Sequence, residues 1–224
     1  RQLNDTILSI EAFMLFKPLH NMADDILADF LARVIRHLKD PSEIAKFKRE
    51  AAPGMIQQIR SFAGRDLRLM VKDLPVDKDL VVVTASKDNF VFAMPHFQMV
   101  INALKRGIPA VGIIALGAGH HIFDDISLAA ATTIGQLAKN GVHQFPRGKP
   151  FAMVAPDGAI KFLDEKSALE IYQFLSVGVW NSLLPELEDL FYRPTLPEDW
   201  AIAPGTALPV PAALQGFDPN LFSL

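Results

Sequence analysis

The chain of 224 residues contains no cysteine. Disulfides, thiolate nucleophiles, cysteine-bound zinc and iron–sulfur clusters are therefore excluded for this chain. The absence of cysteine is compatible with a cytosolic protein, and we expect a cytoplasmic location. The sequence also lacks the Gly-Lys-Ser/Thr of a P-loop, the Gly-x-Ser-x-Gly of a hydrolase and the His-Glu-x-x-His of a zinc peptidase. None of these three chemistries is indicated.

Long apolar runs and a basic excess are also missing. The longest strongly apolar stretch runs from Ile108 to Ala118, which is much shorter than the roughly 20 residues that a membrane-spanning helix needs. With 22 Lys and Arg against 25 Asp and Glu, the chain lacks the positive charge that is typical of nucleic-acid-binding domains. We therefore expect neither a membrane nor a nucleic acid as a partner.

The charge is distributed unevenly along the chain. Residues 164–224 hold 2 of the 22 basic and 9 of the 25 acidic side chains, which leaves 20 basic and 16 acidic ones in residues 1–163. The acidic C-terminal part could lie on the more basic body of the same or of a neighbouring subunit. It could equally be a solvated acidic face.

Strand and helix patterns alternate in the middle of the chain, and the whole sequence predicts three parts. Half of the residues are apolar, which is enough for a sizeable core. We predict a helical N-terminal layer over residues 1–66, an α/β domain over residues 67–192 and an extended proline-rich C-terminal arm over residues 193–224. The predicted fold class is α/β, with three layers and a mostly parallel sheet.

The N-terminal part has the spacing of amphipathic helices. One helix is expected over residues 6–16, and a second one, with a wide apolar stripe, follows Asn21 as its N-cap. Ser42 is expected to cap the next helix, and Pro53-Gly54 to separate it from a fourth. Such a layer can form a dimer interface or a lid, or it can pack on the sheet of its own subunit.

The segment from Asp79 to Asp125 predicts a parallel βαβ unit. Contiguous apolar residues at Leu80–Ala85 and Val111–Leu116 are typical of strands that are buried on both faces. A helix framed by Pro95 and Gly107 connects them. In open α/β sheets, ligands bind where such strands end, so this unit predicts where the protein binds or acts.

Further elements follow the βαβ unit. A helix is predicted from Asp124 or Asp125 to a stop at Asn140-Gly141, and a β-hairpin around the turn at residues 155–158. Asp164 is expected to cap a helix that Pro185 breaks or restarts.

The segment that starts at Arg193 combines six prolines with several large apolar residues. A disordered tail would not be expected to carry so much apolar surface. We therefore predict an arm that lies on this subunit or on a partner, and a homo-oligomer formed through this arm or through the N-terminal helices.

The first loop of the candidate site follows the first βαβ strand. It provides hydroxyls, an amine, a carboxylate and an amide, which can hydrogen-bond an anionic or sugar-like ligand. The predicted ligand-binding residues of this loop are Thr84, Ser86 and Asn89, with Lys87 and Asp88 as catalytic groups. An ordinary polar βα loop is the alternative.

The second loop of the candidate site follows the second strand. Gly117 and Gly119 allow close backbone approach and are predicted to bind the ligand. Position 122 is Ile, so the third Gly or Ala of a dinucleotide fingerprint is missing. His120 or His121 is the predicted proton-transfer group, with a structural role as the alternative.

A metal site is a further alternative for these histidines. It would combine His120 or His121 with Asp124 or Asp125. Adjacent histidine side chains usually diverge, so the distant His96 or His143 would have to complete the three or four ligands that a tight site needs. The sequence identifies no cofactor.

A third loop, at residues 143–150, places Arg147 and Lys149 among prolines and a glycine. These cations could clamp a phosphate or a carboxylate. In a simple strand order, however, the loop approaches its strand from the amino end, on the side opposite the other two loops. A solvated crossover loop is the more common explanation.

The run DLVVVTASKDN, followed by a helix that ends in ALKRGIPAVGII, resembles the second strand-loop-helix-strand of sugar isomerase (SIS) phosphosugar-binding domains. In that family a Ser/Thr-rich loop grips phosphate. The likeness is confined to Asp79–Ile114. Lys87 and Asp88 stand where the family has a Ser-Gly pair, and no equivalent of the family's first glycine-rich loop precedes the segment. The resemblance assigns no family.

The sequence thus predicts a small-molecule-binding α/β protein. The ligand is a small anionic or polar metabolite, held in the crevice between the loops at Thr84–Asn89 and Gly117–His121. Whether the protein is an enzyme stays open. The alternatives are a non-catalytic subunit of a homo- or hetero-oligomeric assembly, and a metal-dependent enzyme that uses the histidine pair.

Overall fold

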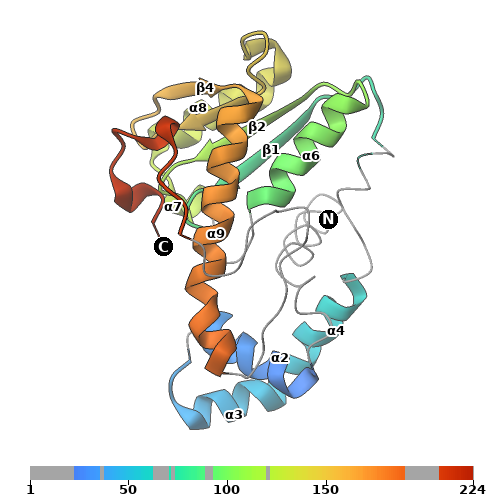
Figure 1. Ribbon diagram of the computed structural model, residues 1–224. Helices are drawn as coiled ribbons and strands as arrows, with labels where there is room; N and C mark the ends of the chain where they lie inside the picture. Colours follow the sequence, from blue (N-terminus) through green and yellow to red (C-terminus); the bar gives the residue numbers. More distant parts are fainter. Residues whose placement is uncertain are drawn as a thin grey trace. The chain divides into compact units, whose positions relative to one another are not determined.

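A computed structural model divides the chain into two compact units, and each is described by itself (Figure 1). The first unit comprises Arg1–Asp66 and Trp180–Thr206, and the second Leu67–Val179 and Ala207–Leu224. The structure describes residues 23–35, 38–62, 71, 74–88, 93–119, 122–189 and 207–223. The helix predicted at residues 6–16 lies outside the described residues, and the division of the chain into three parts stays a prediction.

The described part of the first unit is helical. Its elements are α2 (Asp24–Phe30), the π-helical segment η1 (Leu31–Ile35), α3 (Pro41–Glu50), α4 (Ala52–Phe62) and the part of α9 (Glu165–Asp189) from Trp180 onward. The helix α2 contacts both α3 and α4. Ion pairs of 2.8 Å join Lys48 to Asp29 and Arg60 to Asp24. Because their side chains are partly exposed, each pair adds about 1 kcal/mol or less. Leu27, Phe30 and Ile44 of this unit are buried.

The start of α2 differs from the sequence prediction. The helix begins after Ala23, whose side chain makes no cap hydrogen bond, and not after Asn21. Asp24 and Asp25 in the first turn favour this start, because acidic side chains complement the positive end of the helix dipole. The predicted separation of two helices is confirmed, but the boundary lies at Ala51 and not at Pro53-Gly54. Pro53 and Gly54 lie in the first turn of α4, where proline is tolerated.

The cap of α3 is Asp40 and not Ser42. The Asp40 carboxylate accepts hydrogen bonds from the backbone N–H groups of Ser42 and Glu43, at 2.7 and 3.4 Å. Pro41 occupies the first helical position. A backbone N–H at this position would have no acceptor within the helix, so its absence in proline removes no helical hydrogen bond. Hydrogen bonds from Ser42 hold the pKa of the Asp40 carboxyl below its usual value.

The second unit is built on a four-stranded sheet with the order β1-β2-β3-β4. The strands are β1 (Leu80–Ala85), β2 (Ala110–Ala115), β3 (Phe151–Val154) and β4 (Ile160–Leu163). The pairs β1–β2 and β2–β3 are parallel, and β3–β4 is antiparallel. This mostly parallel sheet confirms the α/β class, the βαβ unit and the predicted hairpin. The connecting helix α6 (Ala93–Lys105) begins two residues before the predicted Pro95.

Alternate residues of the strands face different helices of this unit. On one face Phe151 of β3 packs with Phe97 of α6 and Tyr172 of α9 (Glu165–Asp189), with ring centroids 5.2–5.7 Å apart. Figure 1 shows α6 and α9 on the near side of the sheet. The other face packs on α8 (Leu128–Asn140), where Ile113 and Val154 join Ile134 in an apolar cluster. Thr84 therefore faces α6 and α9, because its neighbour Ala85 belongs to the α8 cluster.

The stretch predicted as one helix from Asp124 or Asp125 is divided. A single turn, α7 (Ile122–Asp125), precedes α8, which begins after Ser127. The Ser127 hydroxyl accepts a hydrogen bond of 3.1 Å from the backbone N–H of Ala130, so serine supplies the cap expected of aspartate. The predicted stop at Asn140-Gly141 is confirmed, with Gly141 at a φ of +56°.

The helix α9 begins as predicted but ends later. The Asp164 carboxylate caps it by accepting a hydrogen bond of 2.8 Å from the Ser167 N–H. The helix then continues through Pro185 to Asp189, so the break predicted at Pro185 is wrong. A proline removes one backbone donor and favours a kink, but a helix can continue beyond it.

The described C-terminal residues, 207–223, belong to the second unit. They contain two short 3-10 turns, η5 (Ala212–Leu214) and η6 (Pro219–Leu221). The Lys161 ammonium donates a hydrogen bond of 2.8 Å to the Ala213 carbonyl, and buried Phe222 packs edge-on against Phe174 of α9. The earlier part of the predicted arm, residues 193–206, lies outside the described residues. In the part of the chain that is described, no helix has the length and apolarity to cross a membrane.

Candidate functional site

The two predicted loops meet at one edge of the sheet. The parallel register pairs Ala85 with Ala115, so β1 and β2 end side by side. The Ser86 N–H then donates to the Ala115 carbonyl at 3.1 Å, and the Lys87 N–H to the Ala118 carbonyl at 2.8 Å. These hydrogen bonds hold the described part of the first loop, residues 84–88, against residues 115–119. The juxtaposition that the βαβ pattern predicts is confirmed.

The second loop depends on its two glycines. Gly117 has a φ of +80°, a conformation that costs other residues free energy. Its N–H donates a hydrogen bond of 2.8 Å to the Ser86 hydroxyl. The Gly119 N–H donates to the Asp125 carboxylate at 3.0 Å. Asp125 thus fixes the loop, a role different from the metal ligation considered as an alternative.

The chain's own C-terminal turn occupies the position between the loops. The Leu221 carbonyl oxygen accepts hydrogen bonds from the Ser86 hydroxyl at 2.5 Å and from the Gly117 N–H at 2.9 Å. A Cβ atom at Gly117 would lie 3.1 Å from the Leu221 side chain, so this loop and the turn are in close contact. Two of the predicted ligand-binding residues are therefore already engaged with a backbone oxygen.

A buried polar cluster lies behind the first loop. Thr84, almost fully buried, places its hydroxyl 3.0 Å from Nδ1 of His96 and 3.4 Å from the hydroxyl of fully buried Tyr172. Asp88 is also buried, and its carboxylate acts on His96 electrostatically. The cluster thus joins the end of β1 to α6 and α9 through polar groups, in a region where unpaired polar groups are costly.

Burial shifts the ionisation of two groups in this cluster. It lowers the pKa of His96 to about 4, although the Asp88 carboxylate opposes the shift. Burial also raises the pKa of the Tyr172 hydroxyl, against the opposing hydrogen bond from Thr84. At neutral pH His96 is therefore a neutral imidazole that can accept a proton or a hydrogen bond, and Tyr172 stays protonated.

Several predicted residues lie outside the described part of the chain. These are Asn89, His120 and His121, and the side chain of Asp124 is not described either. Their roles stay predictions. In the described residues no group of three or more His, Asp or Glu side chains is arranged to hold a metal ion.

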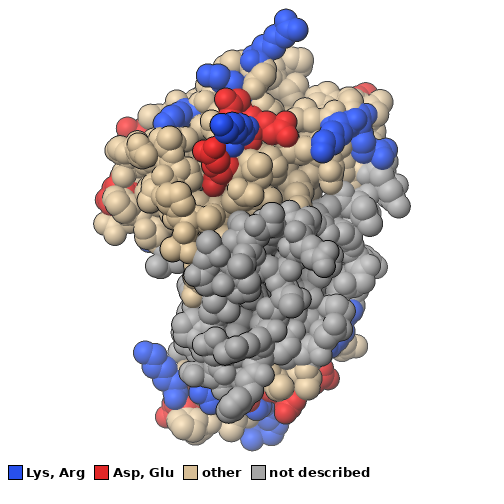
Figure 2. Space-filling view, in the orientation of Figure 1, with Lys and Arg blue, Asp and Glu red and all other residues tan. Residues whose placement is uncertain are grey.

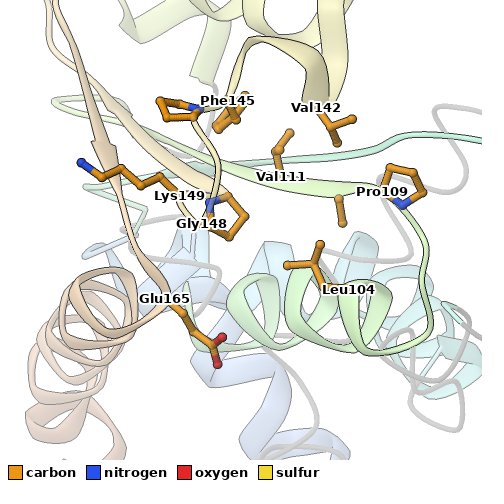
Figure 3. A pocket seen from close by; sticks show the side chains of 11 residues that line it. Leu104, Pro109, Val111, Val142, Phe145, Gly148, Lys149 and Glu165 are labelled. Atoms are coloured by element: carbon orange, nitrogen blue, oxygen red, sulfur yellow. The ribbon is translucent and has the colours of Figure 1, made fainter.

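The third loop lies at the opposite edge of the sheet, as the strand order predicts. The Gly112 N–H donates to the Pro150 carbonyl at 3.0 Å, which places the loop at the amino end of β3. A shallow, mostly apolar pocket of about 480 Å³ is found here, between Leu104, Val142 and Phe145. Figure 3 shows Lys149 and Glu165 extending away from it. Arg147 and Lys149 are both exposed, and Arg147 does not line this pocket.

Sequence reasoning missed the roles of His96, Tyr172 and Leu221. Because side chains alternate between the two faces along β1, Thr84 lies on the face opposite Ala85. This alternation could have indicated that Thr84 points toward α6 and its histidine. No local pattern links Leu221 to Ser86, which is 135 residues away.

Comparisons of the chain with protein-family models, curated proteins and solved structures find no match.

Proposed function

We propose that the second unit binds a small anionic or polar metabolite at the carboxyl edge of β1 and β2. The observation that supports this most is the hydrogen-bonded meeting of residues 84–88 with residues 115–119 at the ends of two parallel strands. Ligands of open α/β sheets bind at such edges. The proposal includes the three-layer, Rossmann-like arrangement of this unit.

The chemistry of the edge favours an oxygen-rich ligand. The Ser86 hydroxyl and the Gly117 N–H offer hydrogen bonds to an acceptor, and Lys87, which is partly exposed, adds a positive charge. Carboxylate and phosphoryl oxygens match such donors. Described acidic and basic side chains are interspersed on the face drawn in Figure 2. The absence of a nucleic acid or membrane partner remains part of the proposal.

Catalysis would use groups that already adjoin the edge. Lys87 and Asp88, with His120 or His121, remain the proposed proton-transfer groups. Neutral His96 is added to them because it contacts Thr84 at the end of β1. A proton acceptor must lie within hydrogen-bond reach of the group it deprotonates. Turnover would therefore require a ligand that approaches Thr84 or Asp88.

Calorimetric titration of the full chain with inorganic phosphate, a hexose phosphate and acetate tests the proposal. At least one of these probes should bind, and Lys87→Ala should weaken that binding about tenfold by removing a charge-assisted contact. Lys149→Ala, at the opposite sheet edge, is the matched control and should leave binding unchanged. Equal losses in both variants, or no binding of any probe, would contradict the proposal.

The non-catalytic subunit stays the second candidate. Light scattering of the full chain tests it, since a monomer at all concentrations would count against an assembly. Elemental analysis of the purified protein tests the metal-dependent alternative, which fails without a stoichiometric metal.

A further inference from the structure

We infer that the C-terminal turn, residues 218–223, is a displaceable cover of the crevice, and that the Leu221 carbonyl oxygen marks where an acceptor oxygen of the ligand binds. This inference rests on the proposed function and adds that the C-terminal turn controls access to the site. It predicts that cover and ligand exclude each other.

Two hydrogen-bond donors from different loops converge on one oxygen. The Ser86 hydroxyl comes from the loop after β1, and the Gly117 N–H from the loop after β2. Both donate to the single oxygen of Leu221, at 2.5 and 2.9 Å. A carboxylate, phosphoryl or carbonyl oxygen of a ligand would need the same two donors. The same position cannot hold Leu221 and a ligand together.

The C-terminal turn keeps its conformation through hydrogen bonds within itself. The Asp218 carboxylate accepts a hydrogen bond of 2.9 Å from the Asn220 N–H, and the Asp218 carbonyl accepts one from the Leu221 N–H at 2.9 Å. The Ser223 N–H donates to the Pro219 carbonyl at 2.9 Å. These bonds stay within the turn, so it can leave the crevice without losing them.

One deeply buried side chain anchors the turn. Phe222 is buried and packs against Phe174 of α9, with ring centroids 5.9 Å apart. Asp218, Pro219 and Asn220 are exposed. Opening the cover therefore requires release of the Phe222 ring and the loss of the two hydrogen bonds that the Leu221 carbonyl accepts. This disrupts far fewer contacts than unfolding of the sheet core would. Segments held in this way open locally before the domain unfolds.

Amide hydrogen exchange of Gly117 in the full chain reports on the opening, because this N–H is shared between the Leu221 carbonyl and the Ser86 hydroxyl, and departure of the turn removes the backbone acceptor. Phe222→Ala should accelerate its exchange by about a hundredfold, as truncation of a buried aromatic ring removes the anchor. Asp218→Ala should accelerate it about fivefold by loosening the turn. Asp164→Ala removes a similar carboxylate cap at the start of α9 and should leave Gly117 unchanged.

Unchanged exchange at Gly117 in both cover variants would overturn the inference. If Phe222→Ala fails to fold, the exchange of Gly117 is compared between the wild type and Asp218→Ala alone, because Asp218→Ala alters an exposed side chain.

Titration of the same proteins with inorganic phosphate and with acetate then separates the cover from the site. The variants should bind a probe more tightly than the wild type, by up to the factor by which they open. Equal binding in all proteins would overturn the cover and leave the proposed function standing. Faster exchange without any binding would count against the proposed function, and the inference would fall with it.

Discussion

The Ser86 hydroxyl and the Leu221 carbonyl oxygen, 135 residues apart in the chain, are joined by a hydrogen bond of 2.5 Å. The bond connects the loop after β1 to the C-terminal turn. It shows that the predicted ligand loop is already organised around an acceptor oxygen. Three features of this region and one of the adjoining core lead to measurable expectations.

Gly117→Ala should destabilise the protein by about 2 kcal/mol, because a positive φ and a close neighbour act together. A Cβ at this position would lie 3.1 Å from the Leu221 side chain. Gly107 is a matched control, with a φ of +76° and nothing within 4 Å of an added Cβ. Chemical denaturation should show a larger loss for Gly117→Ala than for Gly107→Ala. Equal losses would mean that the contact with the turn contributes nothing.

Thr84→Val should cost about 2 kcal/mol, since it leaves the buried Tyr172 hydroxyl without its Thr84 partner and also removes the contact with His96. Tyr172→Phe should cost less, because Thr84 keeps His96. Denaturation of both single variants and of the double variant gives the coupling free energy. A Tyr172→Phe loss that exceeds the Thr84→Val loss would contradict the described cluster.

His96 should make stability depend on pH between about 6.5 and 4. Its pKa is lowered from 6.5 to about 4 in the folded protein, so the unfolded chain binds more protons in this window. The free energy of unfolding should therefore fall as the pH falls, by about 2–3 kcal/mol in total.

The variant His96→Gln should lose most of this pH dependence. His143→Gln, which alters an exposed histidine, should retain it. Denaturation midpoints of the wild type and of both variants, measured at several pH values, show which protein loses the pH dependence. Parallel curves for the wild type and His96→Gln would show that His96 does not titrate as described.

Gly112→Ala should destabilise the core by about 1–3 kcal/mol through overpacking. An added Cβ in β2 would lie 2.5 Å from Cδ1 of Phe151 and 3.0 Å from the Tyr172 hydroxyl. Gly135→Ala in α8, where nothing lies within 4 Å, should be neutral or stabilising. Thermal unfolding of the two variants compares them, and a neutral Gly112→Ala would show that the aromatic cluster has room to move.

The central part of the fold was predictable because its signals are local. Contiguous apolar residues predict β1 and β2, and Gly107 and Gly158 mark turns that have positive φ in the structure. The helix start at Asp40 was missed because Asp and Ser are both good caps, and local composition does not choose between them. Pro185 was misjudged because a proline disfavours a helix without excluding it.

The candidate site was predictable only in part. The meeting of the loops at residues 84–88 and 117–119 follows from parallel pairing, and the structure confirms it. The contact between Ser86 and Leu221 depends on how the C-terminal residues return to the sheet, and no spacing in the sequence encodes that return. The same holds for Tyr172, whose distance of 88 residues from Thr84 is bridged only by packing.

The most direct test of the account is an amide chemical-shift map of the full chain during titration with inorganic phosphate. We expect saturable changes that are largest at Ser86, Lys87 and Gly117, together with changes in residues 218–223 as the turn is displaced. Amides of the opposite edge, such as Gly148 and Lys149, should stay constant. Changes confined to that opposite edge, or no saturable change at Ser86 and Gly117, would contradict the proposal that the carboxyl edge of β1 and β2 is the binding site.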